Sequence, residues 1–412
     1  MFIKMAWRNI FRNKRRTIIA GIAIGLGLAS LIFVDALMIG MERNMIHSAT
    51  ASFMGEGQIH RSGYREAQDV ELTINSPREV VSRLQADPRV SAFAERVMSF
   101  GMISSPSNIN SVNIVGINPS AEKELSQIDE ALQQGDYFEG GSSREILIGS
   151  ELADILEVEL GDRVVVTLAQ AESGDLSQEM FRVSGIYHFN VTEMDLGLAF
   201  IQLEKARRML GLGPQAVHEI ALKFKKAGLG RDKKASFWQE YSSNGNEALG
   251  WNSLMPELEA VFELSQFSTY ITGLILFGVV ALGIINTLFM SIHERMFEFG
   301  VLRAVGTRPF HLGRLIIFEA GALALLSILL GNVLGFAATY IVAQIGIDYT
   351  GIDYTGIEFS GVTFRELLYP VMQLRQYVEY PFWVFIFTLV AGIYPAWYAA
   401  KMKPAEAMRK SF

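Results

Sequence analysis

The side chains that could support chemistry are few and scattered along these 412 residues. His293-Glu294 resembles the beginning of a zinc-protease motif, but no second histidine follows four residues after His293. With six histidines and no cysteine, a cluster of metal ligands is not expected. The sequence has no Gly-x-Ser-x-Gly elbow, and since lysine never follows glycine it has no Gly-x-x-x-x-Gly-Lys phosphate loop. We therefore predict no catalytic residue, no metal site and no cofactor bound by this chain.

Two carboxylates lie within hydrophobic runs, where an acidic side chain is a candidate for function. Asp35 is close to the C-terminal end of the first run, and Glu319 is close to the N-terminal end of the third. Because both can reach a membrane interface, we interpret them as solvated boundary carboxylates, with a functional role as the alternative. Asn286 and Asn332 are predicted to form hydrogen bonds between helices rather than to bind a ligand.

Four hydrophobic runs must position these side chains, and each is long enough to cross a membrane core of about 30 Å as a helix. They cover residues 17–41, 267–292, 315–345 and 380–400. The first run is too long for the core of a signal peptide and lacks a cleavage site, so we predict an uncleaved span. Residues 42–266 are mixed and polar, and this length is enough for a domain with its own hydrophobic core.

Positive charge predicts the orientation of the spans, because lysine and arginine gather in cytoplasmic segments. Basic residues precede the first span, lie within 293–314 and follow the fourth span in 401–412. Both termini and the 293–314 loop are therefore predicted in the cytoplasm, and residues 42–266 and the 346–379 loop outside it. The 42–266 segment has 20 basic and 33 acidic residues, a net charge of −13, which argues against its lying on anionic lipid. The net charge of −7 for the whole chain does not indicate nucleic-acid binding.

Two local patterns concern the membrane segments. Residues 1–16 place basic and apolar side chains on opposite helical faces, which predicts an amphipathic interfacial helix; a plain basic leader is the alternative. The pairs Gly21/Gly25 and Gly331/Gly335 allow close approach of helices, either in a specific dimer seam or in ordinary packing.

The 42–266 segment alternates helix and strand patterns, which predicts an α+β domain. Ser76 is predicted to cap a helix, and Gly174-Asp175 predicts the turn of a hairpin. Residues 228–250 are polar and are predicted to be a surface or linker stretch.

Two segments connect the domain and the spans. Residues 257–267 are predicted to run as one helix into the second span. Residues 346–361 contain a tandem five-residue repeat, which we interpret as part of an extended external loop.

Residues 293–310 follow the second span with an amphipathic pattern. We predict a short cytoplasmic helix that ends at Gly306, with Thr307 capping the helix that follows. A short, rigid helix with apolar surface suits docking into a groove of a soluble partner, and an ordinary turn between spans is the alternative.

The same segment resembles the coupling helix of the FtsX-like permeases, the MacB/Lol group of ABC transporters. The pattern E-R-x-x-E-x-G-x-L-R-A-x-G of that family is similar to residues 294–306, and its Y-P-[AS]-W-x-A-A…P-A-E-A-L-R ending is similar to residues 394–409. Residues 115–119 and 148–162 resemble the MacB-type periplasmic core. The resemblance covers the whole chain, and the order of its motifs is similar to that of the LolC/LolE lipoprotein-releasing permeases.

The resemblance implies four transmembrane helices and an α+β MacB-like periplasmic core domain between the first and the second helix. It implies a multi-pass permease of the bacterial inner membrane that extracts a lipoprotein or another amphiphile from the outer leaflet. The implied partners are a separate homodimeric ABC ATPase that binds ATP and Mg²⁺, a second permease copy or paralogue, membrane lipid, and a periplasmic carrier or adaptor. The alternatives are a MacB-like efflux mechanotransmitter and an FtsX-like transmitter that activates a periplasmic enzyme.

The resemblance also assigns two sets of site residues. The residues implied to contact the ATPase are Glu294, Arg295, Met296, Phe297, Glu298, Phe299, Leu302, Arg303, Val305, Gly306, Arg308 and Phe310. The residues implied to line a substrate cavity are Val34, Leu37, Met38, Met41, Phe267, Tyr270, Ile271 and Leu274.

One stretch departs from the family pattern. LolC-type permeases carry a longer, proline-containing hook at the hairpin, whereas residues 169–177 are short, polar and free of proline. The chain is therefore either the hookless partner of a permease pair or a permease for another hydrophobic cargo.

Overall fold

The computed structural model describes residues 14–138, 141–189, 191–226, 228–348 and 367–403. The described residues divide into two compact units, which we call the helical unit (residues 14–43, 262–348 and 367–403) and the sheet unit (residues 44–261). Most of the predicted interfacial helix, of the five-residue repeat and of the C-terminal tail lies outside the described residues.

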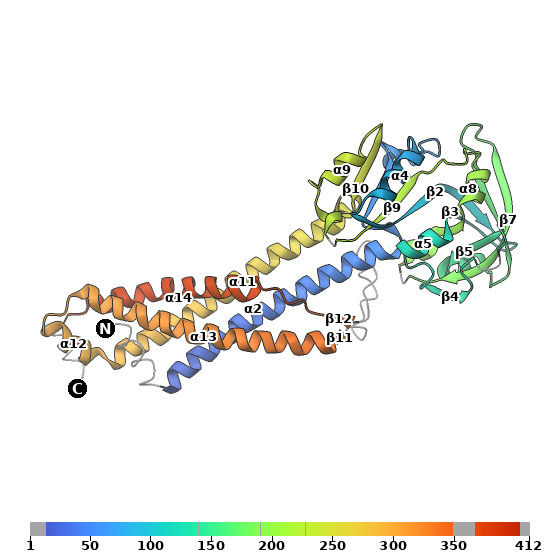
Figure 1. The fold of residues 1–412 in the computed structure, drawn as a ribbon. Coiled ribbons are helices and arrows are strands. Elements are labelled where there is room, and N and C mark those ends of the chain that lie inside the picture. The colour runs from blue at the N-terminus through green and yellow to red at the C-terminus, as the bar shows by residue number, and fades with distance from the viewer. Residues whose placement is uncertain (1–13, 139–140, 190, 227, 349–366, 404–412) are drawn as a thin grey trace. The chain divides into compact units, whose positions relative to one another are not determined.

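Four long apolar helices form most of the helical unit (Figure 1). Their bounds are Lys14–Ala49 (α2), Pro256–Glu294 (α11), Pro309–Ile345 (α13) and Gln376–Lys401 (α14). Each is long and apolar enough to cross a membrane, which confirms the four-helix membrane class. The predicted limits of the spans within these helices stay predictions, because α2 and α11 continue without a break into residues of the sheet unit.

The two glycine pairs face each other within one chain. A Cβ added to Gly331 would lie 2.8 Å from the carbonyl oxygen of Gly25 and 2.9 Å from Leu28, so α2 and α13 touch almost backbone to backbone. Gly335 likewise faces Ala29 and Ile32 at 3.3 Å. Small residues thus allow van der Waals contact between helices where lipid supplies no hydrophobic drive. The structure uses these glycines for packing inside the chain rather than for a dimer seam.

The other helices complete a bundle around α13. Gly392 on α14 faces Ala320 at 3.1 Å and Leu288 of α11 at 3.7 Å, and Gly27 on α2 faces Val280 of α11 at 3.1 Å. The buried side chains of the four helices and of the short helix Met296–Ala304 (α12) share one apolar core. The connection between α13 and α14 holds a two-stranded ladder, Ile347–Asp348 (β11) with Leu367–Leu368 (β12).

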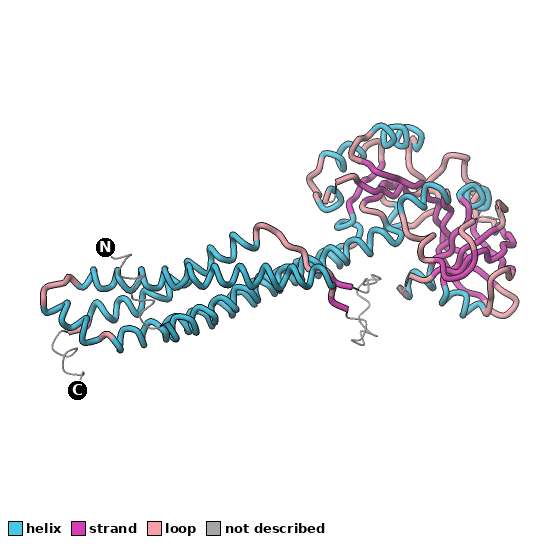
Figure 2. The backbone as a smooth tube through the Cα atoms, turned by 60° about the horizontal axis from the view of Figure 1, so that its bottom comes forward, coloured by secondary structure: helices cyan, strands magenta, loops and turns pink. Residues whose placement is uncertain are grey.

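The sheet unit is built around a ten-stranded mixed sheet (Figure 2). Its strands are Gly57–Arg61 (β1), Val90–Ser104 (β2), Ile109–Ile117 (β3), Leu132–Gly135 (β4), Glu145–Gly149 (β5), Arg163–Ala169 (β6), Leu176–Tyr187 (β7), Leu198–Gln202 (β8), Glu219–Phe224 (β9) and Asn246–Gly250 (β10). Its helices are Tyr64–Ala67 (α3), Pro77–Ala86 (α4), Pro119–Leu125 (α5), Ser150–Leu156 (α6), Thr192–Gly197 (α7), Leu203–Met209 (α8), Ser236–Tyr241 (α9) and Trp251–Leu254 (α10), with a π turn at Thr50–Met54 (η1) and a 3₁₀ turn at Leu229–Arg231 (η2).

Strand pairing divides this unit into two parts that share the long strand β2. Strands β2, β3, β8, β5, β7 and β6 pair in sequence, and β6 pairs back to β2, so this part closes on itself. Its interior is filled by branched and aromatic side chains such as Val166, Phe181 and Ile201. The first half of β2 pairs with β9, which continues through β1 to β10 over a second core that includes Phe224 and Phe237.

Three local predictions for this unit can now be compared with the structure. The hairpin at Gly174-Asp175 is confirmed, since β6 and β7 pair from Arg163 to Ala169. Ser76 precedes α4 but has a left-handed backbone (φ 51°) and makes no side-chain capping bond, so that part of the prediction is wrong. Residues 228–250 were predicted as a surface or linker stretch: the linker is wrong, because α9 and β10 form there, whereas the polar residues 231–234 and 242–245 are exposed as on a surface.

Candidate functional site: the coupling segment and the exposed helix faces

Residues 293–310, which we call the coupling segment, join α11 to α13 at one end of the helical unit. Arg295 interrupts the helix after Glu294 (φ −110°, ψ 17°), and α12 then runs from Met296 to Ala304. The amide of Gly306 (φ 102°) donates to Arg303, and the amide of Thr307 donates to the carbonyl of Leu302. These two bonds form a Schellman ending, as the glycine predicts.

The predicted cap at Thr307 is wrong. The residue that precedes α13 is Arg308, which has extended backbone and makes no side-chain capping bond, and Pro309 occupies the first turn. The turn between α12 and α13 is therefore fixed by the backbone bonds at Gly306 and by the restricted φ of proline.

A buried ion pair attaches the coupling segment to the bundle. Arg295 donates to Glu319 of α13 at 2.6 Å, and their side chains are 12% and 7% exposed. Arg295 also binds Glu298 at 3.1 Å and lies over the ring of Phe299, 4.9 Å from its centroid. Phe299 itself is 1% exposed and belongs to the bundle core. Glu319 is therefore a buried partner of the coupling segment and not the solvated boundary carboxylate that the sequence suggested.

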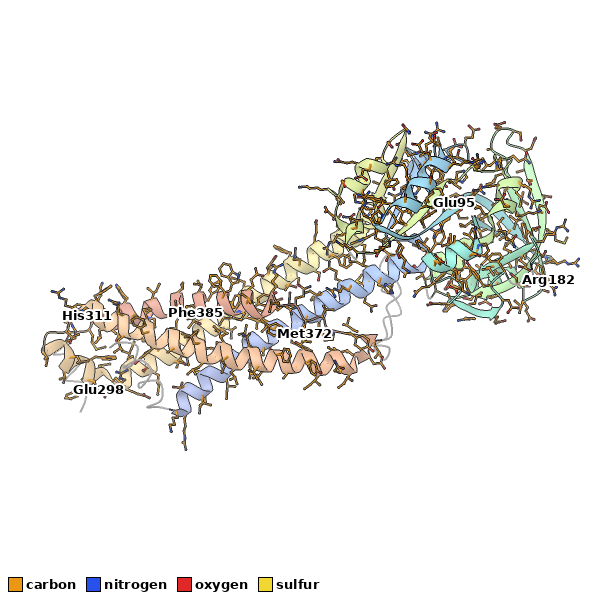
Figure 3. All side chains as sticks on the ribbon, viewed as in Figure 1. Glu95, Arg182, Glu298, His311, Met372 and Phe385 are labelled. Atoms are coloured by element: carbon orange, nitrogen blue, oxygen red, sulfur yellow. The ribbon has the colours of Figure 1, made fainter. Side chains whose placement is uncertain are left out.

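The opposite side of α12 and the turn into α13 carry exposed apolar side chains. Val305 is 82% exposed and Phe310 is 68% exposed, and the side chains of Phe297, Val301 and Leu302 are also accessible. Figure 3 shows Glu298 of α12 and His311 of α13 at the same end of the helical unit. The segment thus combines one buried anchoring face with one apolar face that the described part of the chain leaves uncovered. Val301, which is 40% exposed, was absent from the predicted contact set.

The remaining predicted contact residues divide between these two faces. Glu294, Gly306 and Arg308 are exposed, and Met296 and Arg303 are half-buried. Arg303 donates to the carbonyl of Thr307 at 3.1 Å and so supports the turn. Contact of any of these residues with an ATPase stays a prediction.

The second candidate site comprises the apolar faces of α2 and α11. The α11 residues assigned to a substrate cavity are all exposed: Phe267, Tyr270, Ile271 and Leu274. On α2, Met38 is exposed, and Val34, Leu37 and Met41 are half-buried. The two helices are adjacent, since the hydroxyl of Ser265 lies 3.6 Å from the sulfur of Met38. The exposed stripe continues along α11 through Ile275, Val279, Leu282 and Met290. Its role as a cavity lining stays a prediction.

Asp35 is also paired with protein rather than only with solvent. Gln376 at the start of α14 is 2% exposed and donates to Asp35 at 2.8 Å. Nearby, the amide of Val371 donates to the carbonyl of Ala36, and a Cβ on Gly40 would lie 2.2 Å from the carbonyl oxygen of Tyr369. The segment before α14 therefore packs directly on α2, which sequence spacing alone did not suggest.

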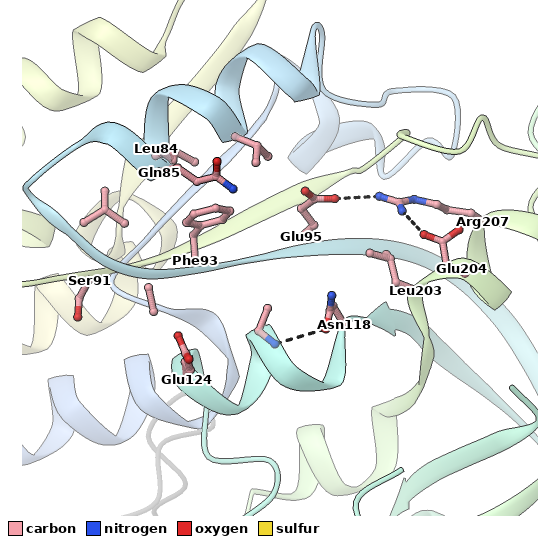
Figure 4. A pocket seen from close by; sticks show the side chains of 14 residues that line it. Leu84, Gln85, Ser91, Phe93, Glu95, Asn118, Glu124, Leu203, Glu204 and Arg207 are labelled. Atoms are coloured by element: carbon pink, nitrogen blue, oxygen red, sulfur yellow. Dashed lines mark hydrogen bonds and ion pairs between the residues drawn. The ribbon is translucent and has the colours of Figure 1, made fainter. Parts of the chain in front are cut away.

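The sheet unit has a cleft of about 470 Å³ over β2, between α4, α5 and α8. Figure 4 shows Arg207 directed toward Glu95 and Glu204, with which it pairs at 2.9 and 2.7 Å. The charges on this wall are thus satisfied by one another. We assign no ligand to this cleft.

The fold and these faces define a membrane permease with a large domain between its first two spans. A family model for a MacB-like periplasmic core domain matches residues 17–228, and one for the FtsX-like permease C-terminal region matches residues 270–404. The chain belongs to the family of permeases with a MacB-like periplasmic core domain, and it carries the FtsX-like C-terminal region.

Individual relatives are distant but align over nearly the whole length. The lipoprotein-releasing system transmembrane protein LolE of Haemophilus influenzae is 22% identical, over 98% of this chain and 98% of its own. The lipoprotein-releasing system transmembrane protein LolC of Xylella fastidiosa is 22% identical, over 94% of this chain and 92% of its own. The crystal structure of the periplasmic region of MacB from Actinobacillus actinomycetemcomitans is 13% identical, with a TM-score of 0.34, over 49% of this chain and 92% of that one.

Proposed function

We propose that this chain is the permease subunit of an ABC transporter that uses ATP to release lipoproteins from the outer leaflet of the bacterial inner membrane. The observation that carries the proposal is the alignment over nearly the full length of both chains with proteins of lipoprotein-releasing systems. In this proposal both termini are cytoplasmic, the sheet unit is periplasmic, and the chain itself hydrolyses nothing.

The geometry of the coupling segment supports a separate ATPase as the source of energy. A helix that transmits movement must be held in one orientation on the membrane bundle and must present a binding surface to its partner. The Arg295–Glu319 pair and Phe299 supply the first property, and the exposed Val305 and Phe310 supply the second. The partner is a homodimeric ABC ATPase that binds ATP and Mg²⁺, and α12 docks in a groove on its surface.

The exposed apolar stripe of α11 supports an amphiphilic cargo and a second permease. Such a stripe faces lipid, a lipid-like cargo or another membrane helix, since each matches its apolar surface. We place the cargo's acyl chains against Phe267, Tyr270, Ile271 and Leu274, with a second permease copy or paralogue on the far side. This arrangement fits extraction from the side, because the cargo enters from the leaflet in which it is anchored.

The hairpin β6–β7 is not assigned to a periplasmic carrier. The amide of Gln170 donates to the carbonyl of Asp175, and the amide of Ala171 donates to the carbonyl of Leu210. The turn is thus tight and rests on its own domain, which leaves no projecting arm. The chain is accordingly placed as the partner without a hook in a permease pair, or in a system that delivers cargo through another surface.

The test is mass spectrometry of the permease–ATPase complex purified in lipid nanodiscs without nucleotide. We expect a bound acylated protein that leaves when ATP is added and stays when a non-hydrolysable analogue is added. A matched complex with Leu274→Glu, which places a charge on the exposed stripe, should lose the acylated protein and still assemble. If the complex contains only bulk phospholipid and its ATPase activity is indifferent to added lipoprotein, the proposal fails, and efflux or transmembrane signalling becomes the better hypothesis.

A further inference from the structure

A fully buried charged cluster lies at the point where α2 enters the sheet unit. The side chains of Arg96 on β2 and Glu122 on α5 have no exposed surface, and they pair at 2.5 Å. Arg96 also binds Glu219 on β9 at 2.7 Å. The other oxygen of Glu219 lies 3.3 Å from His60 on β1. One arginine thus links three elements that are distant in the sequence.

The same arginine holds the last turn of the entering helix. Its Nη2 donates to the carbonyl oxygen of Phe53 at 2.5 Å, and its guanidinium lies 3.8 Å from the centroid of the Phe53 ring. That ring packs edge-on against Phe200 of β8, with centroids 5.4 Å apart. The amide of Gln127 adds a second bond to this turn, at the carbonyl of Ala51. Backbone hydrogen bonds, the packing of the Phe53 ring and the Arg96 guanidinium therefore all hold η1 against the sheet.

The backbone of η1 has an unusual geometry. The amide of Gly55 donates to Thr50, five residues back, which is the π-helical pattern that often marks functional positions. Gly55 has φ 79°, and a Cβ there would lie 2.9 Å from the carbonyl oxygen of Leu222. The chain therefore turns sharply from α2 into β1 at a position that suits only glycine.

Such a cluster is costly, which suggests a role beyond stability. Burial opposes the charge on Arg96, but Glu122 and Glu219 outweigh this effect and raise its pKa, so the guanidinium stays charged. Well-packed apolar residues often stabilise a protein as much as a buried ion pair does, whereas hydrogen-bonded charges specify one geometry. What this cluster adds is a defined direction for the last turn of α2.

The second connection to the membrane helices runs through Met255 and the start of α11. Arg65 donates to the carbonyls of Ser253 and Leu254, but its side chain is exposed and has only backbone partners there. Met255 then leaves helical geometry (φ −125°, ψ 73°) before α11 begins. By contrast, α2 continues into η1 at the very next residue. The first turn of α11 is nevertheless held to the sheet unit, since Glu259 pairs with Lys233 at 2.6 Å and Leu258 is 1% exposed.

We propose that Arg96 is a positioning residue for energy transmission: it makes the end of α2 and the sheet unit move as one body. Displacement of α2 in the membrane then reaches the sheet unit through the clamped turn η1. The inference rests on the proposed transport function, since it names the residue through which movement reaches the domain.

The first test measures the lipoprotein released per ATP hydrolysed by the reconstituted complex. Arg96→Lys keeps the charge but cannot bind Phe53, Glu122 and Glu219 at once. We expect it to retain ATPase activity and to release about fivefold less lipoprotein per ATP, at the lower end of typical coupling free energies. Phe53→Leu, a milder change, should lower the ratio in the same direction. The matched control Phe237→Leu removes a ring from the other core of the unit and should lower only its melting temperature.

The second test does not depend on transport, so it separates this inference from the proposed function. The chain has no cysteine, so spin labels at His47→Cys and Lys123→Cys report only the distance between the end of α2 and α5. We expect one narrow distance that is unchanged by ATP in the complex and that broadens in Arg96→Lys. A wild-type distance that shifts with ATP, or an unchanged distance and ratio in both Arg96→Lys and Phe53→Leu, would overturn the inference. If wild type releases no lipoprotein but the distances behave as expected, only the proposed function fails.

Discussion

Replacing Glu319 with alanine should detach the coupling segment from the membrane bundle. The substitution leaves Arg295 buried without its 2.6 Å partner. Breaking a buried ion pair from one side typically costs 3–5 kcal/mol, because an uncompensated charge remains. Arg295 keeps Glu298 at 3.1 Å and the ring of Phe299, so we expect the lower end, about 3 kcal/mol in the free energy of unfolding.

The measurement is reversible unfolding of the full chain in mixed micelles, together with the affinity of each variant for the ATPase subunit. Glu379→Ala is the matched control, since its pair with Arg375 is an exposed i,i+4 pair on α14 and should contribute less than about 0.5 kcal/mol. The double variant Arg295→Met/Glu319→Leu should recover most of the lost stability, because an apolar pair can replace a buried ion pair.

The affinity for the ATPase separates anchoring from stability. In Glu319→Ala the apolar face of α12 is intact but no longer held in one orientation, so we expect weaker binding and a loss of lipoprotein-stimulated hydrolysis. Equal effects of Glu319→Ala and Glu379→Ala on stability would refute the reasoning. So would a Glu319→Ala permease with full stability and normal coupling to the ATPase.

Three further predictions follow from other contacts. Val305→Glu should weaken ATPase binding at least about tenfold without changing the unfolding midpoint, because exposed positions rarely affect stability; a lowered midpoint would mean that Val305 packs inside the chain. Gly331→Ala should destabilise the bundle by about 1–3 kcal/mol through overpacking, whereas Gly278→Ala, which meets open space, should not; equal unfolding midpoints would contradict the tight seam. His218 accepts the amide of Met98 on Nδ1, and burial lowers its pKa below 6.5, so stability is fully present above pH 6.5 and falls as the pH drops below it. His218→Asn should flatten that slope in a pH series of melting temperatures, and an unchanged slope would exclude His218 as its origin.

The sequence correctly predicted those elements whose residues carry a strong local pattern. Runs of apolar residues long enough to span a membrane identified all four helices, and residues 257–267 do continue into α11. The ending at Gly306 was predictable because only a residue that tolerates positive φ closes a Schellman motif. The coupling helix was identified by the resemblance of residues 294–306 to a motif of the FtsX-like permeases, while their pattern alone predicted only a short amphipathic helix.

Two caps were mispredicted for a common reason. Ser76 and Thr307 are the residue types that favour helix N-termini, but capping also requires extended backbone at the right position. The backbone of Ser76 is in the left-handed region, and the N-cap position of α13 belongs to Arg308, one residue after Thr307. Tertiary geometry, which the sequence does not display, decided both cases.

The helix and strand within 228–250 were missed because the composition of this stretch conceals their pattern. Glycine, serine and asparagine outnumber the apolar residues there, yet Phe237, Trp238 and Tyr241 are all buried in the second core. Their spacing of one and three residues fits one face of a short helix. The aromatic residues, which bury the most area each, were the signal that outweighed polarity.

Neither of the two buried arginine clusters could be predicted from the sequence, because the residues that pair in each are far apart along the chain. Arg295 pairs with a residue on the next helix, and Arg96 joins elements from β1 to β9. Apolar faces alone allow helices to slide or rotate in small steps, since dispersion contacts are non-directional. A hydrogen-bonded ion pair defines a single register between two elements, and removing one partner leaves the other charge buried and unpaired. A permease that works by moving rigid helices needs such a fixed contact between each helix and the segment that it moves.

We therefore expect the two clusters to behave alike. In each cluster, replacing the whole ion pair by apolar residues should preserve folding better than replacing one partner alone. Neither kind of variant should preserve the coupling of ATP hydrolysis to lipoprotein release. Recovery of coupling along with stability in Arg295→Met/Glu319→Leu would show that the pair serves packing alone.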